Sequence, residues 1–128
     1  MEQNRQKNQE IKGYRLLGKI ALGGMSEVYK AMHPILNKEV ILKKLFAKAP
    51  DAFFERFKRE AKLMMDISHP NIAHIFDYFK EDNASYIVME YISGYNLSEF
   101  IKKYQKLPAY LASYIAMEIA KGLSYAHS

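Results

Sequence analysis

The chain has 128 residues, of which 49% are hydrophobic and 26% are charged, a balance typical of one globular domain with a buried core. It contains no cysteine, which excludes disulfides and thiolate metal sites and fits a cytoplasmic location in a reducing compartment. The formal net charge is +5, but the 19 basic residues are spread along the chain among 14 acidic ones. We therefore expect a solvated surface and no nucleic-acid partner.

The pattern of polar residues argues against two further classes of protein. The first twelve residues, MEQNRQKNQEIK, lack an apolar core, so we expect a flexible polar leader over 1–12 rather than a signal peptide or membrane anchor. No apolar run in the chain approaches the roughly 18 residues of a membrane helix. His69 and His74 are interrupted by Pro70, so a helical pair of metal ligands is not expected, and we expect no metal site.

Apolar runs bounded by turn signals predict five strands, at residues 14–20, 27–32, 39–45, 72–79 and 85–91. Between the third and fourth strands, helical spacing predicts a helix over 51–67 with Asp51 as its N-cap. After the fifth strand, a loop leads into a short helix within 93–104. A long helix follows within 107–128, with Pro108 suited to its first turn. This order predicts an α+β fold with a meandering antiparallel sheet.

Lys43 stands out because it lies inside the most apolar of these strands. Alternation of period two puts it on one face of the strand with Ile41 and Leu45. One explanation is an edge lysine whose aliphatic stem reaches water. The other explanation requires a carboxylate on a neighbouring element.

The helix over 51–67 offers such a carboxylate. One stripe of this helix, spaced by four, three, four and three residues, contains Phe53, Phe57, Glu60, Met64 and Ile67. Glu60 is its only charge, and a carboxylate on the buried face of a helix is costly unless it is paired. The sequence therefore predicts an ion pair between Lys43 and Glu60.

The order of these motifs resembles the N-terminal lobe of protein kinases. A glycine loop, a strand ending in Lys43, a helix carrying Glu60, and the segments HPNI, YIVMEY and SGYNL follow one another as in that family. The segments GGMSEVYKA and RFKREAKLM are most similar to bacterial serine/threonine kinases of the eukaryotic type. The resemblance runs from Tyr14 to Ser128. It implies a five-stranded antiparallel sheet with one packed helix over 13–92, and the first two helices of an incomplete C-terminal lobe over 93–128.

By position, the resemblance implies a binding site for the phosphates of ATP. The family pattern G-x-G-x-x-G-x-V falls on Ala21, Gly23, Ser26 and Val28, and Gly24 is an additional glycine. The alternative is a plain hairpin turn, which explains two glycines but not the lysine and glutamate that follow. Lys43 would hold the α- and β-phosphates, and Glu60 would orient it.

The resemblance also implies how the rest of the nucleotide is held. Val28 and Ile41 would lie on the adenine, with Met89 as gatekeeper at the back of the pocket. The backbone of Glu90 and Ile92 would hydrogen-bond the edge of the adenine. Asn96 would reach the ribose. Met64 and Ile75 would pack the helix against the sheet.

The parts that perform phosphoryl transfer in this family are missing from these 128 residues. There is no H-R-D and no D-F-G, and the aspartates present are Asp51, Asp66, Asp77 and Asp82. The family uses Mg²⁺, but its ligands are not among these residues. We expect an ATP-binding chain that does not transfer phosphate by itself, so whether it is an enzyme stays open.

Three hypotheses remain. The chain is the front part of a serine/threonine kinase with a protein substrate, or a naturally short, non-catalytic module that binds a nucleotide or partner, or an unrelated basic domain that binds nucleic acid. The last helix, 109–127, carries only Glu118 and Lys121 as charges and is apolar over most of its circumference. We therefore expect it to be covered, by a partner chain or by self-association. The third hypothesis leaves Glu60 in its stripe unexplained.

Overall fold

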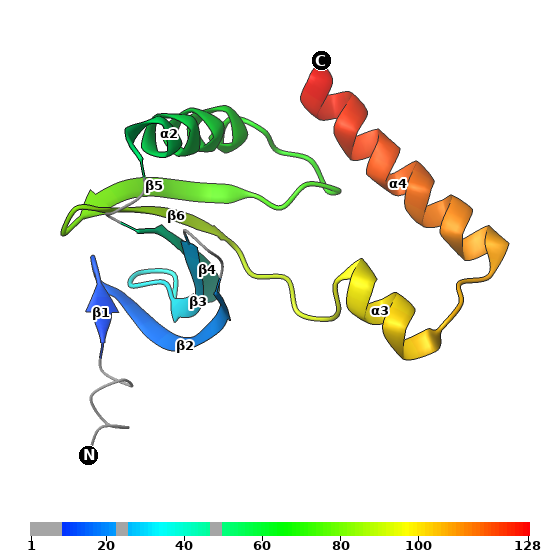
Figure 1. Cartoon of the computed structure of the whole chain (residues 1–128), viewed down its shortest axis with the longest axis horizontal. Coiled ribbons are helices and arrows are strands. Elements are labelled where there is room, and N and C mark those ends of the chain that lie inside the picture. The colour runs from blue at the N-terminus through cyan, green and yellow to red at the C-terminus, as the bar shows by residue number, and fades with distance from the viewer. Residues whose placement is uncertain (1–8, 23–25, 47–49) are drawn as a thin grey trace. The chain divides into compact units, whose positions relative to one another are not determined.

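The structure, a computed structural model, describes residues 9–22, 26–46 and 50–128. Within them, six strands form one antiparallel sheet in the order β1-β2-β3-β4-β6-β5 (Figure 1). The strands are β1 (Glu10–Ile11), β2 (Tyr14–Leu22), β3 (Ser26–Met32), β4 (Glu39–Leu45), β5 (Ile75–Glu81) and β6 (Ala84–Glu90). The helices are α2 (Asp51–Met65), α3 (Leu97–Tyr104) and α4 (Ala109–His127). The predicted α+β architecture is confirmed. The predicted simple meander is wrong, because β4 pairs with β6 rather than with β5, which follows it in the chain.

Five strands were predicted, and the described residues contain a sixth, β1. This strand of two residues lies inside the segment expected to be a flexible leader, and it pairs with the start of β2. Lys12 and Gly13 connect the two strands with φ angles of 50° and 86°. Two consecutive positive φ angles are the geometry of the tightest hairpin turns. A strand this short carries no alternation of its own, so it depends on the turn and could not be recognised from its pattern.

One face of the curled sheet encloses the larger part of the core. Its buried side chains include Val40 and Leu42 of β4 and Tyr86 and Val88 of β6. Tyr86 stacks on Phe79 with ring centroids 5.0 Å apart. These residues alternate along their strands, as period-two side-chain geometry requires. The other face of the sheet is left to α2 and to the candidate site.

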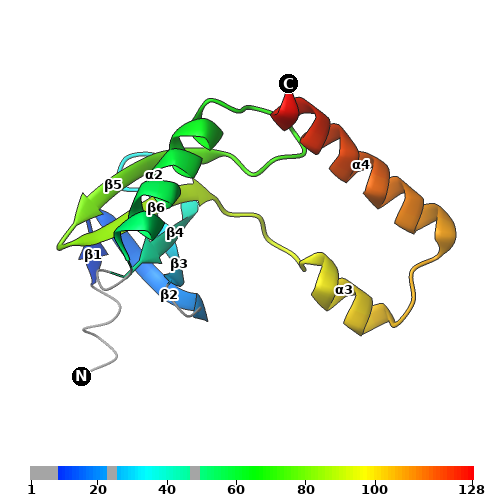
Figure 2. The same ribbon diagram turned by 45° about the horizontal axis from the view of Figure 1, so that its top comes forward.

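Helix α2 lies across β5 and β6 in both views of the molecule (Figures 1 and 2). Ala61 is fully buried there against Ile75 and Ile87, with Phe57 and Met64 packed beside it. The predicted packing of Met64 and Ile75 between helix and sheet is confirmed. The prediction of Asp51 as N-cap is wrong by one residue, because Pro50 takes the cap position and Asp51 begins the helix.

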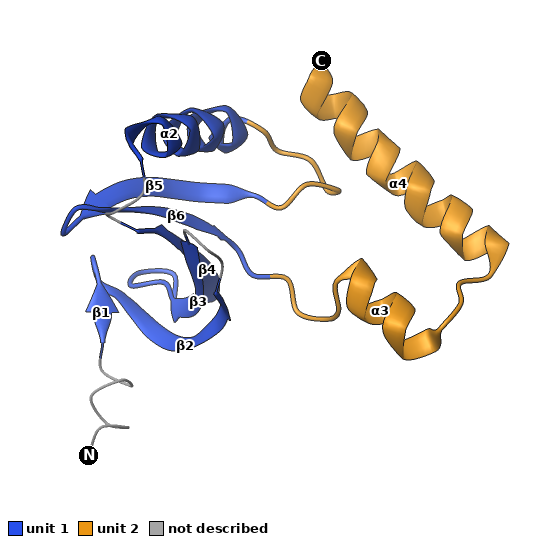
Figure 3. Cartoon of the chain, in the orientation of Figure 1, with its two compact units in different colours: residues 1–66, 74–91 blue, residues 67–73, 92–128 orange. Residues whose placement is uncertain are grey.

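The chain divides into two compact units, shown in different colours in Figure 3. The first comprises residues 1–66 and 74–91, and the second comprises 67–73 and 92–128. In the second unit, the side-chain amide of Asn71 donates to the backbone oxygen of Glu118 at 2.9 Å and to its carboxylate at 2.7 Å. Asn71 thus ties the segment 67–73 to α4, where the ring of His69 also lies 4.9 Å from that of Tyr125.

Along the described parts of the chain, no helix combines the length and the hydrophobicity needed to cross a bilayer.

Candidate functional site

The register of the sheet brings several of the predicted site residues into adjacent rows. Val28 of β3 pairs with Ala21 of β2 on one side and with Lys43 of β4 on the other. In the next row, Ile41 pairs with Met89 of β6. Because side chains alternate along a strand, Ile41, Lys43 and Met89 share the face on which α2 packs.

Lys43 presents its ammonium group on this face beside apolar neighbours. The residue is exposed, whereas Ile41 is buried and Val28 and Met89 are half-buried. Among the residues that the structure describes, no carboxylate lies within ion-pair distance of its Nζ. An accessible cation beside a half-buried apolar surface can accept a ligand with an anionic end and a flat apolar end.

Glu60 does not pair with Lys43 in this structure, contrary to the prediction. Its side chain is 61% exposed and lies 3.0 Å from Arg56 Nε, one turn earlier on α2. The buried stripe of the helix runs through Phe57, Ala61 and Met64 rather than through Glu60. At roughly 100° per residue, Glu60 lies at the edge of that stripe, where water solvates the carboxylate and no buried partner is required.

The predicted phosphate loop is described only at its two ends. Gly23 and Gly24 lie outside the described residues. Ala21 is exposed near the end of β2, and Ser26 is half-buried at the start of β3, where it pairs with Leu45. The predicted strands on either side of the loop pair antiparallel. The contact of this loop with phosphate stays a prediction.

The end of β6 carries contacts that the sequence did not indicate. The backbone N–H of Glu90 donates to the oxygen of His74 at 2.8 Å, and the Glu90 carboxylate accepts from the His74 N–H at 3.1 Å. On the other side, Lys30 Nζ lies 4.6 Å from the centroid of the Tyr91 ring. Lys30 went unnoticed in the sequence, although alternation places it on the same face of β3 as Val28.

Two predicted residues belong to the second unit. Ile92 is exposed, and Asn96 occupies the N-cap of α3. The side-chain oxygen of Asn96 accepts from the Glu99 N–H at 2.8 Å, and its side-chain nitrogen donates to the Glu99 carboxylate at 3.1 Å. The side chain of Asn96 thus caps the start of the helix, so a contact with ribose would compete with the cap.

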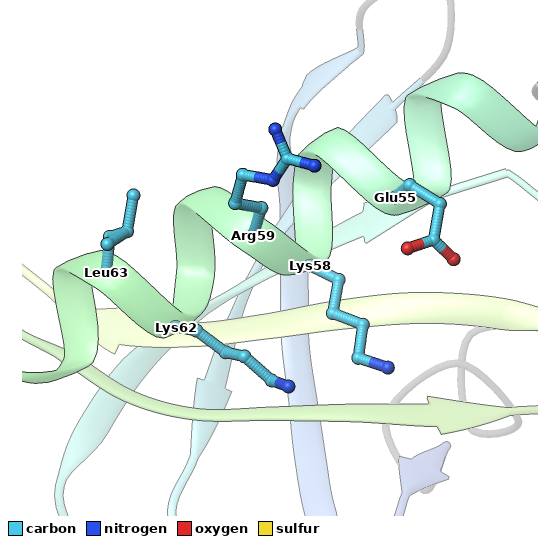
Figure 4. Close-up of a pocket in the computed structure, with 5 residues that line it drawn as sticks. All are labelled: Glu55, Lys58, Arg59, Lys62 and Leu63. Carbon is cyan, nitrogen blue, oxygen red and sulfur yellow. The ribbon is translucent and has the colours of Figure 1, made fainter.

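A second place for an anion lies on the outer face of α2 (Figure 4). A shallow hollow of about 370 Å³ there is lined by Glu55, Lys58, Arg59, Lys62 and Leu63. Lys58 and Lys62 point to one side of the helix, and Arg59 and Leu63 point to the other. This surface has cations but offers a single apolar side chain, so it fits a nucleotide less well than the Lys43 face does.

The chain matches a known protein family over most of its length. The model of the protein kinase domain matches residues 14–128. The chain belongs to the protein kinase family. The resemblance read from the motifs is thereby confirmed, including its extent along the chain.

Bacterial serine/threonine kinases are among the curated relatives of the chain. Serine/threonine-protein kinase PrkC of Bacillus subtilis is 41% identical over 116 residues, which are 89% of this chain and 18% of that protein. A probable serine/threonine-protein kinase of Clostridium perfringens is also 41% identical, over 117 residues. The kinase domain of Mycobacterium tuberculosis PknI superposes with a TM-score of 0.83 at 28% identity, over 94% of this chain and 50% of that chain. The chain therefore spans under a fifth of PrkC and half of the PknI kinase domain.

Proposed function

We propose that this chain is the ATP-binding part of a serine/threonine protein kinase. The observation that carries the proposal is the exposed ammonium of Lys43, flanked on one sheet face by Val28, Ile41 and Met89. A nucleotide has the matching chemistry, because its phosphates are anionic and its base is a flat apolar ring. A cytoplasmic location, where ATP is available, is part of the same proposal.

Within this site, Lys43 would attract the phosphates as a point charge. Val28 and Ile41 would contact the adenine, and Met89 would limit the depth of the pocket. Glu60 would orient Lys43 only after it has left Arg56, because one carboxylate now serves that arginine. Ala21, Gly23, Gly24 and Ser26 would line the phosphate loop, and Glu90, Ile92 and Asn96 would contact the base and ribose.

Transfer of phosphate to a protein substrate requires groups that these residues do not contain. The described residues hold no group of three histidine or acidic side chains that could bind a metal ion. Magnesium would therefore depend on the phosphate oxygens of ATP for its contacts here. The sequence contains no H-R-D and no D-F-G. We therefore propose that the 128-residue chain binds ATP without hydrolysing it and without transferring its phosphate to a substrate.

A second candidate function is that of a non-catalytic module which binds a nucleotide or a partner chain. The observation in its favour is the apolar surface of α4, where Tyr110, Tyr114, Met117, Ile119, Leu123 and Tyr125 are exposed. A surface of this kind is normally covered. Either further kinase-domain polypeptide, a second copy or a different protein would cover it. Sedimentation would be measured for the chain alone and for the chain fused to the rest of a relative's kinase domain. Self-association of the chain alone that is lost in the fusion would show that the kinase domain itself covers α4.

The proposal is tested by ATP-induced stabilisation of the full chain. A ligand at 100 times its Kd stabilises a protein by about 2.7 kcal/mol, which raises Tm by several degrees in a domain of this size. We expect that rise in the wild type and in Lys44→Ala, and its loss in Lys43→Ala. Lys44 is a matched control because it lies on the opposite face of β4, over the Tyr86 ring. Equal shifts in both variants would contradict the assignment.

A further inference from the structure

Tyr91 lies between Glu90 and Ile92, whose backbone is predicted to bind the adenine. Its ring contacts a lysine that is itself ion-paired. Lys30 Nζ lies 4.6 Å from the centroid of the Tyr91 ring. The same ammonium lies 3.3 Å from Glu39 Oε1. Lys30 belongs to β3 and Glu39 begins β4, so two strands of the sheet contribute to one contact with the residue after β6.

The geometry of this trio follows from the register of the sheet. Lys30 pairs with Ile41, which in turn pairs with Met89, so these residues lie in one row. Glu39 is two residues before Ile41 and shares its face. The lysine therefore lies beside the predicted adenine contacts and reaches outward to the residue that follows Glu90.

The charge of Lys30 is secured by its partners. Its side chain is 29% exposed, and the hydrogen bond to Glu39, with the nearby Tyr91, raises the pKa of the amine. The ammonium is thus present throughout the physiological pH range, and it is attracted to the negative face of the ring. Glu39 fixes the position of the ammonium, and the ammonium fixes the ring.

The opposite flank of this backbone is fixed by His74, the residue before β5. Both the N–H and the carboxylate of Glu90 bond to the backbone of His74. Glu90 is thus tied to the residue before β5, and Tyr91 contacts Lys30 of β3. A movement of the backbone at Glu90 and Tyr91 would therefore break at least one of these contacts.

We propose that Lys30, Glu39 and Tyr91 form a clamp that sets the position of the Glu90–Tyr91 backbone and so determines affinity for the adenine base. This inference rests on the proposed function, because it assigns a role at the same nucleotide site. The clamp does not touch the ligand, and Lys30 is a positioning residue. Its effect is specific, since backbone hydrogen bonds to a base tolerate displacements of only a few tenths of an ångström, whereas phosphate attraction to Lys43 tolerates more.

The experiment measures the Kd of the full 128-residue chain for ATP and for inorganic tripolyphosphate by calorimetry. The variants are Lys30→Met and Tyr91→Leu, with Lys30→Arg and Tyr91→Phe as conservative rescues. Lys38→Met is the matched control: it also removes one positive charge stacked on a ring, since Lys38 Nζ lies 4.4 Å from the centroid of Phe76. Urea unfolding of each variant shows whether the fold is retained.

We expect Lys30→Met and Tyr91→Leu to raise the Kd for ATP by roughly three- to tenfold. This is the range expected for the loss of one partly desolvated cation–π contact. Tripolyphosphate should bind them as it binds the wild type, and the rescues and Lys38→Met should bind ATP normally. Equal weakening of both ligands, or unchanged ATP affinity, would overturn the clamp while wild-type ATP binding still stands. A wild type that binds neither ligand would overturn the proposed function itself, and the clamp with it.

Discussion

Arg56 and Glu60 lie one turn apart on α2, and Arg56 Nε donates a hydrogen bond to Glu60 Oε1 at 3.0 Å. The side chains are 78% and 61% exposed, so the pair is solvated and worth only about 0.3–0.5 kcal/mol. A contact this weak can be exchanged for another. The arginine is therefore a competitor for the carboxylate that the kinase resemblance assigns to Lys43.

Replacing Arg56 by glutamine should release Glu60 and strengthen ATP binding. Because the competing contact is weak, we expect about a twofold decrease in Kd, and no more than threefold. Arg59→Gln is the control, since it removes an equal charge from the same helix and leaves the Arg56–Glu60 contact in place. Competition would be refuted if the two variants changed the affinity equally, or if Arg56→Gln weakened it.

The core enclosed by the sheet should dominate stability. Leu42 is fully buried in β4, and Leu42→Ala should lower the free energy of unfolding by about 2–5 kcal/mol, through lost transfer energy and the cavity left behind. Leu36→Ala, at a side chain that is 59% exposed, should change it by less than about 0.5 kcal/mol. Urea titrations measure both values. Similar losses at the two positions would show that the core is assigned wrongly.

Most of the sheet could be predicted from the sequence because its strands alternate or are continuously apolar. Alternation also placed Lys43 with Ile41 on one face of its strand. The pairing of β4 with β6 did not follow from it, because alternation carries no information about which strands are neighbours. The buried face of α2 was harder to predict. Two stripes of α2 have helical spacing, and the one that packs is chosen by Ala61, whose small side chain allows close approach to the sheet.

Other features depend on partners that are distant in the sequence. Asn71 and Glu118 are 47 residues apart, and nothing in either local pattern indicates their bond. The contact of Lys30 with Tyr91 likewise depends on the exit of the chain from β6. Asn96 was predicted as a ribose ligand, whereas its local role as a helix cap is visible in the spacing to Glu99.

Acid should loosen the segment 67–73 from α4. The pKa of Glu118 is lowered, first by the hydrogen bond from Asn71 and next by Lys121. A carboxylate with a lowered folded-state pKa adds stability above its unfolded pKa, and this contribution is lost as pH falls through the folded value. The side-chain amide resonances of Asn71 should therefore shift below about pH 4. If the backbone amides of 69–73 titrated identically in Asn71→Ala, the anchor would not be responsible.

Gly122 should not tolerate alanine in the way that an exposed helix position does. A Cβ there would lie 3.2 Å from the backbone oxygen of Asn71 and 3.4 Å from Ile72 Cγ1. Alanine normally gains about 1 kcal/mol over glycine inside a helix, and here we expect that gain to be offset by displacement of the loop. Faster amide exchange at Asn71 and Ile72 in Gly122→Ala would support this, with Ser124→Ala as the control on the same helix. A full gain in stability with unchanged exchange would contradict it.

The central claim, that the nucleotide binds at the sheet face which carries Lys43, is tested most directly by an amide chemical-shift map of the full chain titrated with ATP. We expect the largest changes to fall on 21–28, 41–43 and 89–92, and Lys43→Met to remove them. Changes centred on Lys58, Arg59 and Lys62, and retained in Lys43→Met, would instead place the anion on the outer face of α2, away from Lys43.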